Sequence, residues 1–149
     1  MTPTLPAIPG TYGLILWLPH DTRARIGRLG TYDFPAGWYA YWGSAHGPGG
    51  LAARIRHHVN LTTRPHWHFD FLRPHGQIKA VLFTLHPDDL ECLWVQRALT
   101  FPNANVPAQG FGNQDCRQRC PAHLLYFGTH LNLDDLATHV KASTTVHLD

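Results

Sequence analysis

Arg54 and His58 lie one helical turn apart in a segment that follows a tyrosine-containing strand and a glycine-rich turn. If residues 50–59 form a helix, every fourth residue contributes to one apolar stripe, made of Leu51, Ile55 and Val59. Arg54 and His58 then project together along the margin of that stripe. One helical turn advances roughly 5 Å, which is about the span of a single phosphodiester. The spacing therefore indicates that both side chains could engage one phosphate.

Two tyrosines lie on the strands expected before this helix. Tyr12 ends the motif GTY at the start of an apolar run, and Tyr41 begins the motif YWG. Together with the helix sequence LAARIRHH, which contains Leu-x-x-Arg-x-x-x-His, the two motifs resemble the GIY-YIG nuclease pattern. More closely, residues 10–127 are similar to a small stand-alone group of the Uri endonuclease superfamily, a group long labelled only as a domain of unknown function.

The chain departs from the general pattern in two ways. Tyr12 and Tyr41 are farther apart than in most of the superfamily, and the intervening residues 24–29 and 31–37 predict another strand and a turn. The stand-alone group typically has this longer hairpin. Trp42 stands where a small branched residue is usual, and we expect it to crowd or shape the cleft.

Glu91 is the only glutamate in the chain, and it lies in the first turn of a helix expected over residues 90–101. An acid at a helix start stabilises the helix dipole, so a capping carboxylate is one interpretation. The resemblance instead implies a glutamate on a later helix that faces the tyrosines and holds a single divalent cation, and Glu91 is the one glutamate available. Mg²⁺ or Mn²⁺ would suit, because such a cation keeps several waters and takes its remaining ligands from the phosphate.

The resemblance also implies a catalytic role for each site residue. Tyr12 would be the general base for an attacking water, provided that a cation lowers its pKa from about 10. Arg54 would stabilise charge on the phosphoryl oxygens, and the metal on Glu91 would neutralise the leaving oxygen. Tyr41 and His58 would position the phosphate and the water.

A second histidine and several further residues complete the expected nuclease site. His68 resembles the histidine that follows the catalytic helix and contacts the scissile phosphate or water, with His66 or Asp70 orienting it. The residues expected to contact nucleic acid, with DNA favoured, are Gly43, Ser44, Arg56, Arg117 and Arg119. Specificity could come from an unidentified partner protein, because modules of this kind often borrow it.

Two other functions stay open. As a strand, residues 65–71 would place His66, His68 and Asp70 on one face, which would suit a zinc-dependent hydrolase. The residue after Asp70 is Phe71, however, where metallo-hydrolases of the β-lactamase type need another histidine. Alternatively, the chain is a non-catalytic nucleic-acid-binding or interaction module on the same scaffold.

The cysteines allow a zinc site, although the sequence does not favour one. Cys116, Cys120 and His123 could supply three ligands, with His66 or Cys92 as a fourth. Their spacing matches no common zinc finger, so we expect no structural zinc. An odd number of cysteines without an export signal also predicts reduced thiols and no disulfide framework.

Length and composition indicate one domain. A chain of 149 residues with 44% hydrophobic content can bury a core. We expect a domain over residues 10–142, a flexible segment at residues 1–9 and a fraying tail at residues 143–149. The order of elements is mixed α and β, and the resemblance implies an α+β fold with a small antiparallel central sheet and flanking helices. Strands are expected near residues 12–18, 24–29, 38–43 and 77–85, and helices near residues 50–59, 90–101 and 133–142.

Charge and hydropathy restrict the partners only weakly. A formal charge of +2 and a pI near 8.6 fall short of the strongly basic profile of a dedicated nucleic-acid binder. No apolar run approaches the ~18 residues of a membrane-spanning helix, and residues 1–9 lack the regions of a signal peptide. We therefore expect a cytoplasmic protein without a membrane partner.

Overall fold

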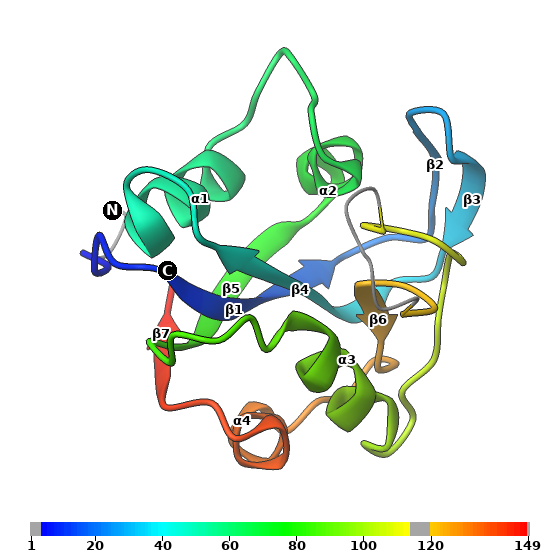
Figure 1. The fold of residues 1–149 in the computed structure, drawn as a ribbon. Coiled ribbons are helices and arrows are strands. Elements are labelled where there is room, and N and C mark those ends of the chain that lie inside the picture. Colours follow the sequence, from blue (N-terminus) through cyan, green and yellow to red (C-terminus); the bar gives the residue numbers. More distant parts are fainter. Residues whose placement is uncertain (1–3, 114–119, 149) are drawn as a thin grey trace.

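The computed structural model describes residues 4–113 and 120–148, which form two β-sheets and four α-helices (Figure 1). The central antiparallel sheet has the order β6-β4-β1-β5-β7, with β1 (Gly10–Leu18), β4 (Gly37–Ala45), β5 (Gln77–Thr84), β6 (Leu124–Tyr126) and β7 (Thr144–His147). A separate hairpin pairs β2 (Thr22–Ile26) with β3 (Gly30–Phe34). The helices are α1 (Gly50–Val59), α2 (His68–Leu72), α3 (Glu91–Leu99) and α4 (Leu133–Val140), and a short 3-10 helix, η1 (Arg73–His75), follows α2. The expected mixed α/β fold with an antiparallel sheet and flanking helices is confirmed.

The central strand, β1, carries the first tyrosine motif. It pairs with β4 on one side and with β5 on the other. Helices cover both faces of the sheet, which explains why β1 is an almost continuous apolar run without the alternation of a half-exposed strand (Figure 1). The register with β4 places Tyr12 opposite Gly43 and Leu14 opposite Tyr41. Because side chains alternate between the faces of a strand, both tyrosines project from the same face.

The two faces of the sheet carry different helices and different parts of the core. Helices α1 and α2 lie on the face that bears the tyrosines, and α3 and α4 lie on the opposite face (Figure 1). On the first face, Leu51 and Ile55 of α1 pack in one buried cluster with Phe69 of α2. On the second face, Trp94 of α3 packs in another cluster with Leu136 of α4. The apolar stripe expected on α1 is therefore its core-facing side.

Trp42 belongs to the second cluster and does not shape the cleft, contrary to our expectation. Its buried ring meets Trp94 edge to face, with the ring centroids 6.0 Å apart. It lies opposite Gly13, where a Cβ atom would come within 2.3 Å of the Trp42 ring. Trp42 points away from Tyr41 because neighbouring residues of a strand face opposite sides of the sheet.

Two segments differ from the expected secondary structure. Residues 31–37, expected as a turn, contain most of β3, whose alternating exposure is typical of a strand with one face toward the core. The expected fraying tail instead forms β7, which pairs with β5 at the edge of the central sheet. Both differences result from pairing with a strand elsewhere in the chain, which local composition does not encode.

The helices are short compared with the thickness of a bilayer. Helix α1 has 10 residues, whereas a spanning helix needs about 20. Across residues 4–113 and 120–148, no helix has the length and apolar character that crossing a membrane would require.

Arg73 holds the C-terminal end of α1 against η1. Its guanidinium donates hydrogen bonds to the carbonyl oxygens of His58 (2.9 Å), Val59 (2.6 Å) and Gly76 (3.0 Å). The last carbonyls of a helix have no partner within the helix, and a cation at this end also interacts favourably with the helix dipole. Arg73 therefore fixes the helix that carries Arg54 and His58.

We predict that Arg73→Ala lowers the free energy of unfolding by about 2 kcal/mol, because hydrogen bonds from a charged donor are lost and carbonyl groups lose their partner. Urea unfolding followed by circular dichroism measures the change. Arg23→Ala is the control, because Arg23 is exposed and only approaches Asp33 at 3.6 Å, and it should change stability by less than about 0.5 kcal/mol. Equal losses in the two variants would contradict the role assigned to Arg73.

Candidate active site

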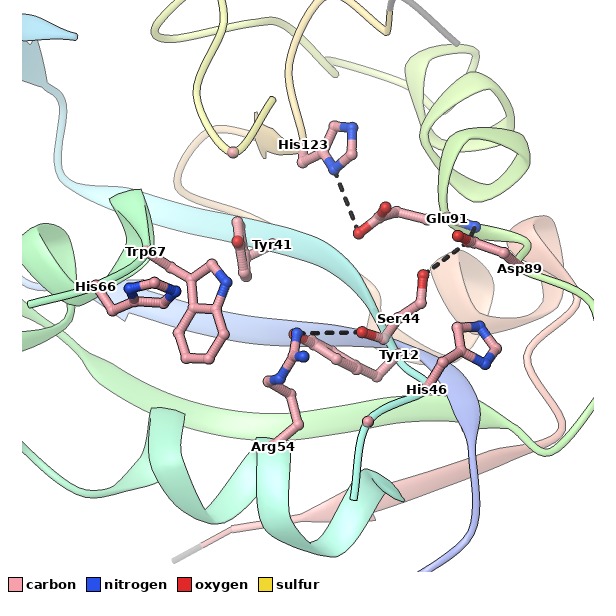
Figure 2. A pocket seen from close by; sticks show the side chains of 12 residues that line it. Tyr12, Tyr41, Ser44, His46, Arg54, His66, Trp67, Asp89, Glu91 and His123 are labelled. Atoms are coloured by element: carbon pink, nitrogen blue, oxygen red, sulfur yellow. Dashed lines mark hydrogen bonds and ion pairs between the residues drawn. The ribbon is translucent and has the colours of Figure 1, made fainter. Parts of the chain in front are cut away.

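A cleft of about 340 Å³ lies where the two helical layers meet at one end of the central sheet (Figure 2). Tyr12 and Tyr41 form its floor from β1 and β4, and Arg54 reaches it from α1. Glu91 enters from the opposite layer, at the start of α3. The cleft thus combines side chains that are far apart in sequence and that come from both faces of the sheet.

The two tyrosines present their hydroxyl groups to the cleft while their rings are buried. The Tyr12 hydroxyl lies 3.1 Å from Nε2 of His58, and the Tyr41 ring stacks on Phe69 with centroids 4.7 Å apart. Burial raises the pKa of Tyr12, and the nearby charge of Arg54 lowers it only in part. Burial likewise raises the pKa of Tyr41. Without further positive charge, both hydroxyl groups therefore stay protonated at neutral pH.

Arg54 is held in place by uncharged partners. One Nη1 hydrogen bond goes to the carbonyl oxygen of Ser44 at 3.2 Å, and the guanidinium lies over the ring of Trp67, 4.5 Å from its centroid. Within the described residues, no carboxylate forms an ion pair with Arg54. Its positive charge is therefore uncompensated and faces the cleft, an arrangement that attracts an anion.

Behind Tyr12, His58 belongs to a buried polar network with Asp70 and His57. His58 is only 1% exposed, so it does not project from the margin of α1 as the sequence suggested. Its Nδ1 lies 3.8 Å from Oδ1 of Asp70, within ion-pair range but too far for a hydrogen bond. His57 Nε2 contacts the same oxygen at 3.1 Å. Burial lowers the pKa of His58, so its imidazole is neutral at pH 7.

Asp70 also explains why residues 65–71 do not form the expected strand. Its Oδ2 accepts hydrogen bonds from the backbone N–H groups of His66 (2.8 Å) and Trp67 (3.0 Å), and it thereby caps the start of α2. Burial opposes ionisation of the carboxyl, but the contacts with His58, with the two amides and with His57 outweigh it and hold the pKa of Asp70 below its ordinary range. The helical turn buries the Asp70 side chain, whereas His66 stays exposed.

The expected zinc face of His66, His68 and Asp70 is consequently absent. In the described part of the chain, the groups of possible metal ligands whose ligating atoms lie within 4.8 Å of one another are His57, His58 and Asp70, and Cys92, Cys120 and His123. His66 lines the cleft without His68. The structure therefore gives no support to a zinc-dependent hydrolase built on that face.

Glu91 shares its wall of the cleft with a second carboxylate and a histidine (Figure 2). Its Oε1 lies 3.4 Å from Nδ1 of the buried His123. Asp89 Oδ1 accepts hydrogen bonds from the Glu91 backbone N–H at 3.0 Å and from Ser44 Oγ at 2.7 Å. Mg²⁺ and Mn²⁺ prefer oxygen ligands such as carboxylates and hydroxyl groups. The side chains of this wall therefore have the ligand types that such a cation requires.

His68 does not reach the cleft, contrary to the sequence-based assignment. Its Nδ1 accepts a hydrogen bond from the backbone N–H of Gly112 at 2.8 Å, and its ring packs against Phe111. Burial lowers the pKa of His68. Because Gly112 is part of the cleft wall, His68 positions that wall and does not contact a phosphate directly.

The expected nucleic-acid contacts have different positions in the fold. Ser44 lines the cleft, whereas Gly43 lies beneath the Tyr12 ring, where a Cβ atom would approach within 2.5 Å. Arg56 is exposed on α1 and belongs to a separate shallow hollow. Cys116, Arg117 and Arg119 fall outside the described residues, so their expected roles remain predictions.

The sequence analysis did not assign six of the described residues that line the cleft: His46, Gly47, Trp67, Asp89, Gly112 and His123. Asp89 lies just before the helix expected from residue 90, and its spacing of two residues from Glu91 was visible in the sequence. His123 was considered as a zinc ligand. Its contact with Glu91 depends on how the segment before β6 folds against α3, and no local signal encodes that.

The expectation of reduced thiols is wrong for this structure, because Cys92 and Cys120 form a disulfide. Cys92 lies in the first turn of α3 and Cys120 precedes β6, 28 residues along the chain. Packing brings their Cα atoms to 6.1 Å, within the usual range for a bridge. An odd cysteine count did not reveal that two of the three would meet.

Comparison with known proteins identifies a sequence family without an activity attached to it. The model of the family described as "Domain of unknown function DUF123" matches residues 11–145. The match spans the cleft residues from Tyr12 to His123. No curated protein and no solved structure matches the chain.

We predict that Asp70 makes the stability of the fold depend on pH in the acid range. Because its folded pKa is depressed, ionised Asp70 stabilises the fold above the unfolded pKa of about 3.9, and this contribution is lost as pH falls toward the folded value. Asp70→Asn should lower the free energy of unfolding at pH 7 by about 2 kcal/mol, as hydrogen bonds to a charged acceptor are weakened. The variant should also lose less stability than the wild type between pH 5 and acid pH.

Chemical denaturation at a series of pH values measures both effects. Asp88→Asn is the control, because that carboxylate is 78% exposed and only approaches His86 at 3.9 Å. It should change stability at pH 7 by less than about 0.5 kcal/mol. An acid profile of Asp70→Asn parallel to that of the wild type would show that the network does not contribute as described.

Proposed function

The chain belongs to the DUF123 family, and we propose that it is a metal-dependent endonuclease that hydrolyses phosphodiester bonds of nucleic acid, with DNA favoured. The observation that carries this proposal is the meeting of four side chains from four elements in one cleft, namely Tyr12, Tyr41, Arg54 and Glu91. The same residue types in the same order characterise the GIY-YIG pattern. We therefore include membership of the Uri endonuclease superfamily and a cytoplasmic location in the proposal.

The charges in the cleft suit a phosphodiester bridged to a cation. The uncompensated guanidinium of Arg54 would hold the non-bridging oxygens from one wall. Glu91, with Asp89 beside it, would hold Mg²⁺ or Mn²⁺ on the opposite wall. When bound, the cation supplies positive charge that neutralises the leaving oxygen. The Tyr41 hydroxyl lies on the floor between the two walls, where it can position the phosphate (Figure 2).

The hydrogen bond between Tyr12 and His58 suggests how a proton leaves the attacking water. The raised pKa of Tyr12 makes a free phenolate costly. If the hydroxyl passes its proton to Nε2 of His58 as it accepts one from water, no free phenolate forms. His58 can accept because burial keeps it neutral, and Asp70 at 3.8 Å stabilises the resulting imidazolium. Tyr12 is thus the general base in direct contact with water, and His58 and Asp70 act through it.

The proposed roles of Glu91 in metal binding and of Arg54 in phosphate binding can be tested separately. Glu91→Gln and Arg54→Ala should each lower the cleavage rate by at least roughly a hundredfold, the usual effect of losing one electrostatic partner of the transition state. Glu91→Gln should still bind nucleic acid but lose its response to added Mg²⁺, whereas Arg54→Ala should keep that response at a lower rate. Arg28→Ala, in the exposed β2–β3 turn, is the control and should cleave at the wild-type rate.

Labelled single-stranded, duplex and branched DNA and RNA, with and without Mg²⁺ or Mn²⁺, provide the assay. Cleavage by the wild type with wild-type rates in both cleft variants would place the active site elsewhere. Binding by the wild type without cleavage of any substrate would favour the alternative of a non-catalytic binding module.

The proton path predicts a specific pH dependence. Catalysis needs neutral His58, whose pKa is lowered by burial, so the rate should hold from pH 8 down to about 6.5, the ordinary histidine pKa, and fall only below it. Tyr12→Phe should lower the rate by roughly a hundredfold with little effect on binding. His58→Gln should lower the rate and remove the acid limb of the profile. An unchanged acid limb in His58→Gln would exclude His58 as the group that titrates.

A further inference from the structure

A second group of metal-binding side chains lies next to the cleft, on the layer that carries α3. Cys92, Cys120 and His123 are all buried, and their ligating atoms lie within 4.8 Å of one another. The Cys92 sulfur is 3.9 Å from Nε2 of His123. Two sulfur ligands and an imidazole are typical of a zinc site and not of a site for Mg²⁺, which prefers oxygen.

The distances fit a tetrahedral zinc ion. Zn–S bonds of ~2.3 Å and Zn–N bonds of ~2.0 Å put a sulfur and a nitrogen ligand about 3.5 Å apart and two sulfur ligands about 3.8 Å apart. The observed separation between Cys92 Sγ and His123 Nε2 is 3.9 Å, so these atoms need to move very little. The sulfur of Cys120 lies within the same 4.8 Å group, and it has to part from Cys92 before it can bind a metal.

The second nitrogen of His123 provides independent support. Zinc-binding histidines almost always direct their other ring nitrogen at a carboxylate, a carbonyl or water, which fixes the tautomer and the ring orientation. Here Nδ1 of His123 lies 3.4 Å from the carboxylate of Glu91 while Nε2 faces the cysteine sulfur. The histidine is therefore already oriented as a zinc ligand with its carboxylate partner.

We propose that Cys92, Cys120 and His123 form a zinc site when the two cysteines are reduced, and that the disulfide is the metal-free oxidised state of the same residues. A dithiol reductant would transfer two electrons to the Cys92–Cys120 bond, giving two thiols and becoming a disulfide itself. Zn²⁺ would then displace one proton from each thiol and bind both thiolates and Nε2 of His123. A fourth coordination position remains for another ligand. In the proposed cytoplasmic location, where thiols are kept reduced, the zinc state would predominate.

One consequence rests on the proposed nuclease function, unlike the zinc site itself. His123 fixed by zinc would hold the carboxylate of Glu91 at the wall of the cleft. His123 would then be a positioning residue for the catalytic cation, and opening or closing the disulfide would alter metal-dependent cleavage without altering Arg54 or the tyrosines.

Zinc binding by the full chain, without nucleic acid and without a metal-affinity tag, tests the site directly. The protein is reduced with excess dithiol, freed of reductant under anaerobic conditions and titrated with Zn²⁺ against a chromophoric chelator. We expect one zinc per reduced chain and none for the oxidised chain. Cys120→Ser and His123→Asn should each weaken binding by at least roughly tenfold. His130→Asn, an exposed histidine, is the matched control and should bind like the wild type.

A second measurement on the wild type does not depend on any variant. Co²⁺ added to the reduced chain should give the absorption of a tetrahedral thiolate complex, and Zn²⁺ should abolish it. The proposal is wrong if the reduced chain binds no zinc, if Cys120→Ser binds as tightly as the wild type, or if the disulfide stays closed in excess dithiol. Zinc binding in a protein that cleaves no nucleic acid would leave the site established and refute only the nuclease function.

Discussion

The antiparallel pairing of β1 with β4 is the constraint on which the site depends. In this register Tyr12 faces Gly43 and Gly13 faces Trp42, so each tight position opposite a large ring is occupied by a glycine. Gly43 leaves room for Tyr12 on the cleft face, and Gly13 leaves room for Trp42 on the opposite face. A slip of β4 by one residue would move every side chain of that strand to the other face and place Tyr41 in the core under α3. The glycines of the two motifs therefore fix the register as well as the space around the tyrosines.

The position of the cleft at the end of this strand pair allows both helical layers to contribute. The layer with α1 supplies Arg54 and the buried histidine behind Tyr12, while the layer with α3 supplies the two carboxylates and His123. Positive and negative groups consequently lie on opposite walls, separated by the tyrosine floor (Figure 2). This division of charge suits the proposed occupant, a phosphate bound together with a metal.

The local sequence pattern predicted most helices and strands and some of the cleft residues. The remaining features depend on contacts between segments that are distant in the sequence. The apolar run of β1 and the four-residue spacing in α1 were visible in the sequence, and Glu91 was identifiable because it is the only glutamate. The burial of His58 was not predictable, since it depends on Asp70 reaching back from α2. The same limit applies to β7, whose polar sequence becomes a strand only through its partner β5, and to the pairing of Cys92 with Cys120.

The approach of His58 to Asp70 differs from the usual pairing of buried polar groups. Buried polar groups normally have hydrogen-bond partners. The Asp70 carboxylate has three, namely two backbone amides and the ring of His57. His58 Nδ1, by contrast, has no hydrogen-bond partner within the described residues and stops 3.8 Å from the carboxylate. Such a gap is unfavourable for a neutral imidazole, but protonation at Nε2 would turn it into an attraction between full charges in a poorly solvated interior. A transiently charged His58, with its proton received from Tyr12 as proposed, would therefore gain an attraction to Asp70 that the neutral ring lacks.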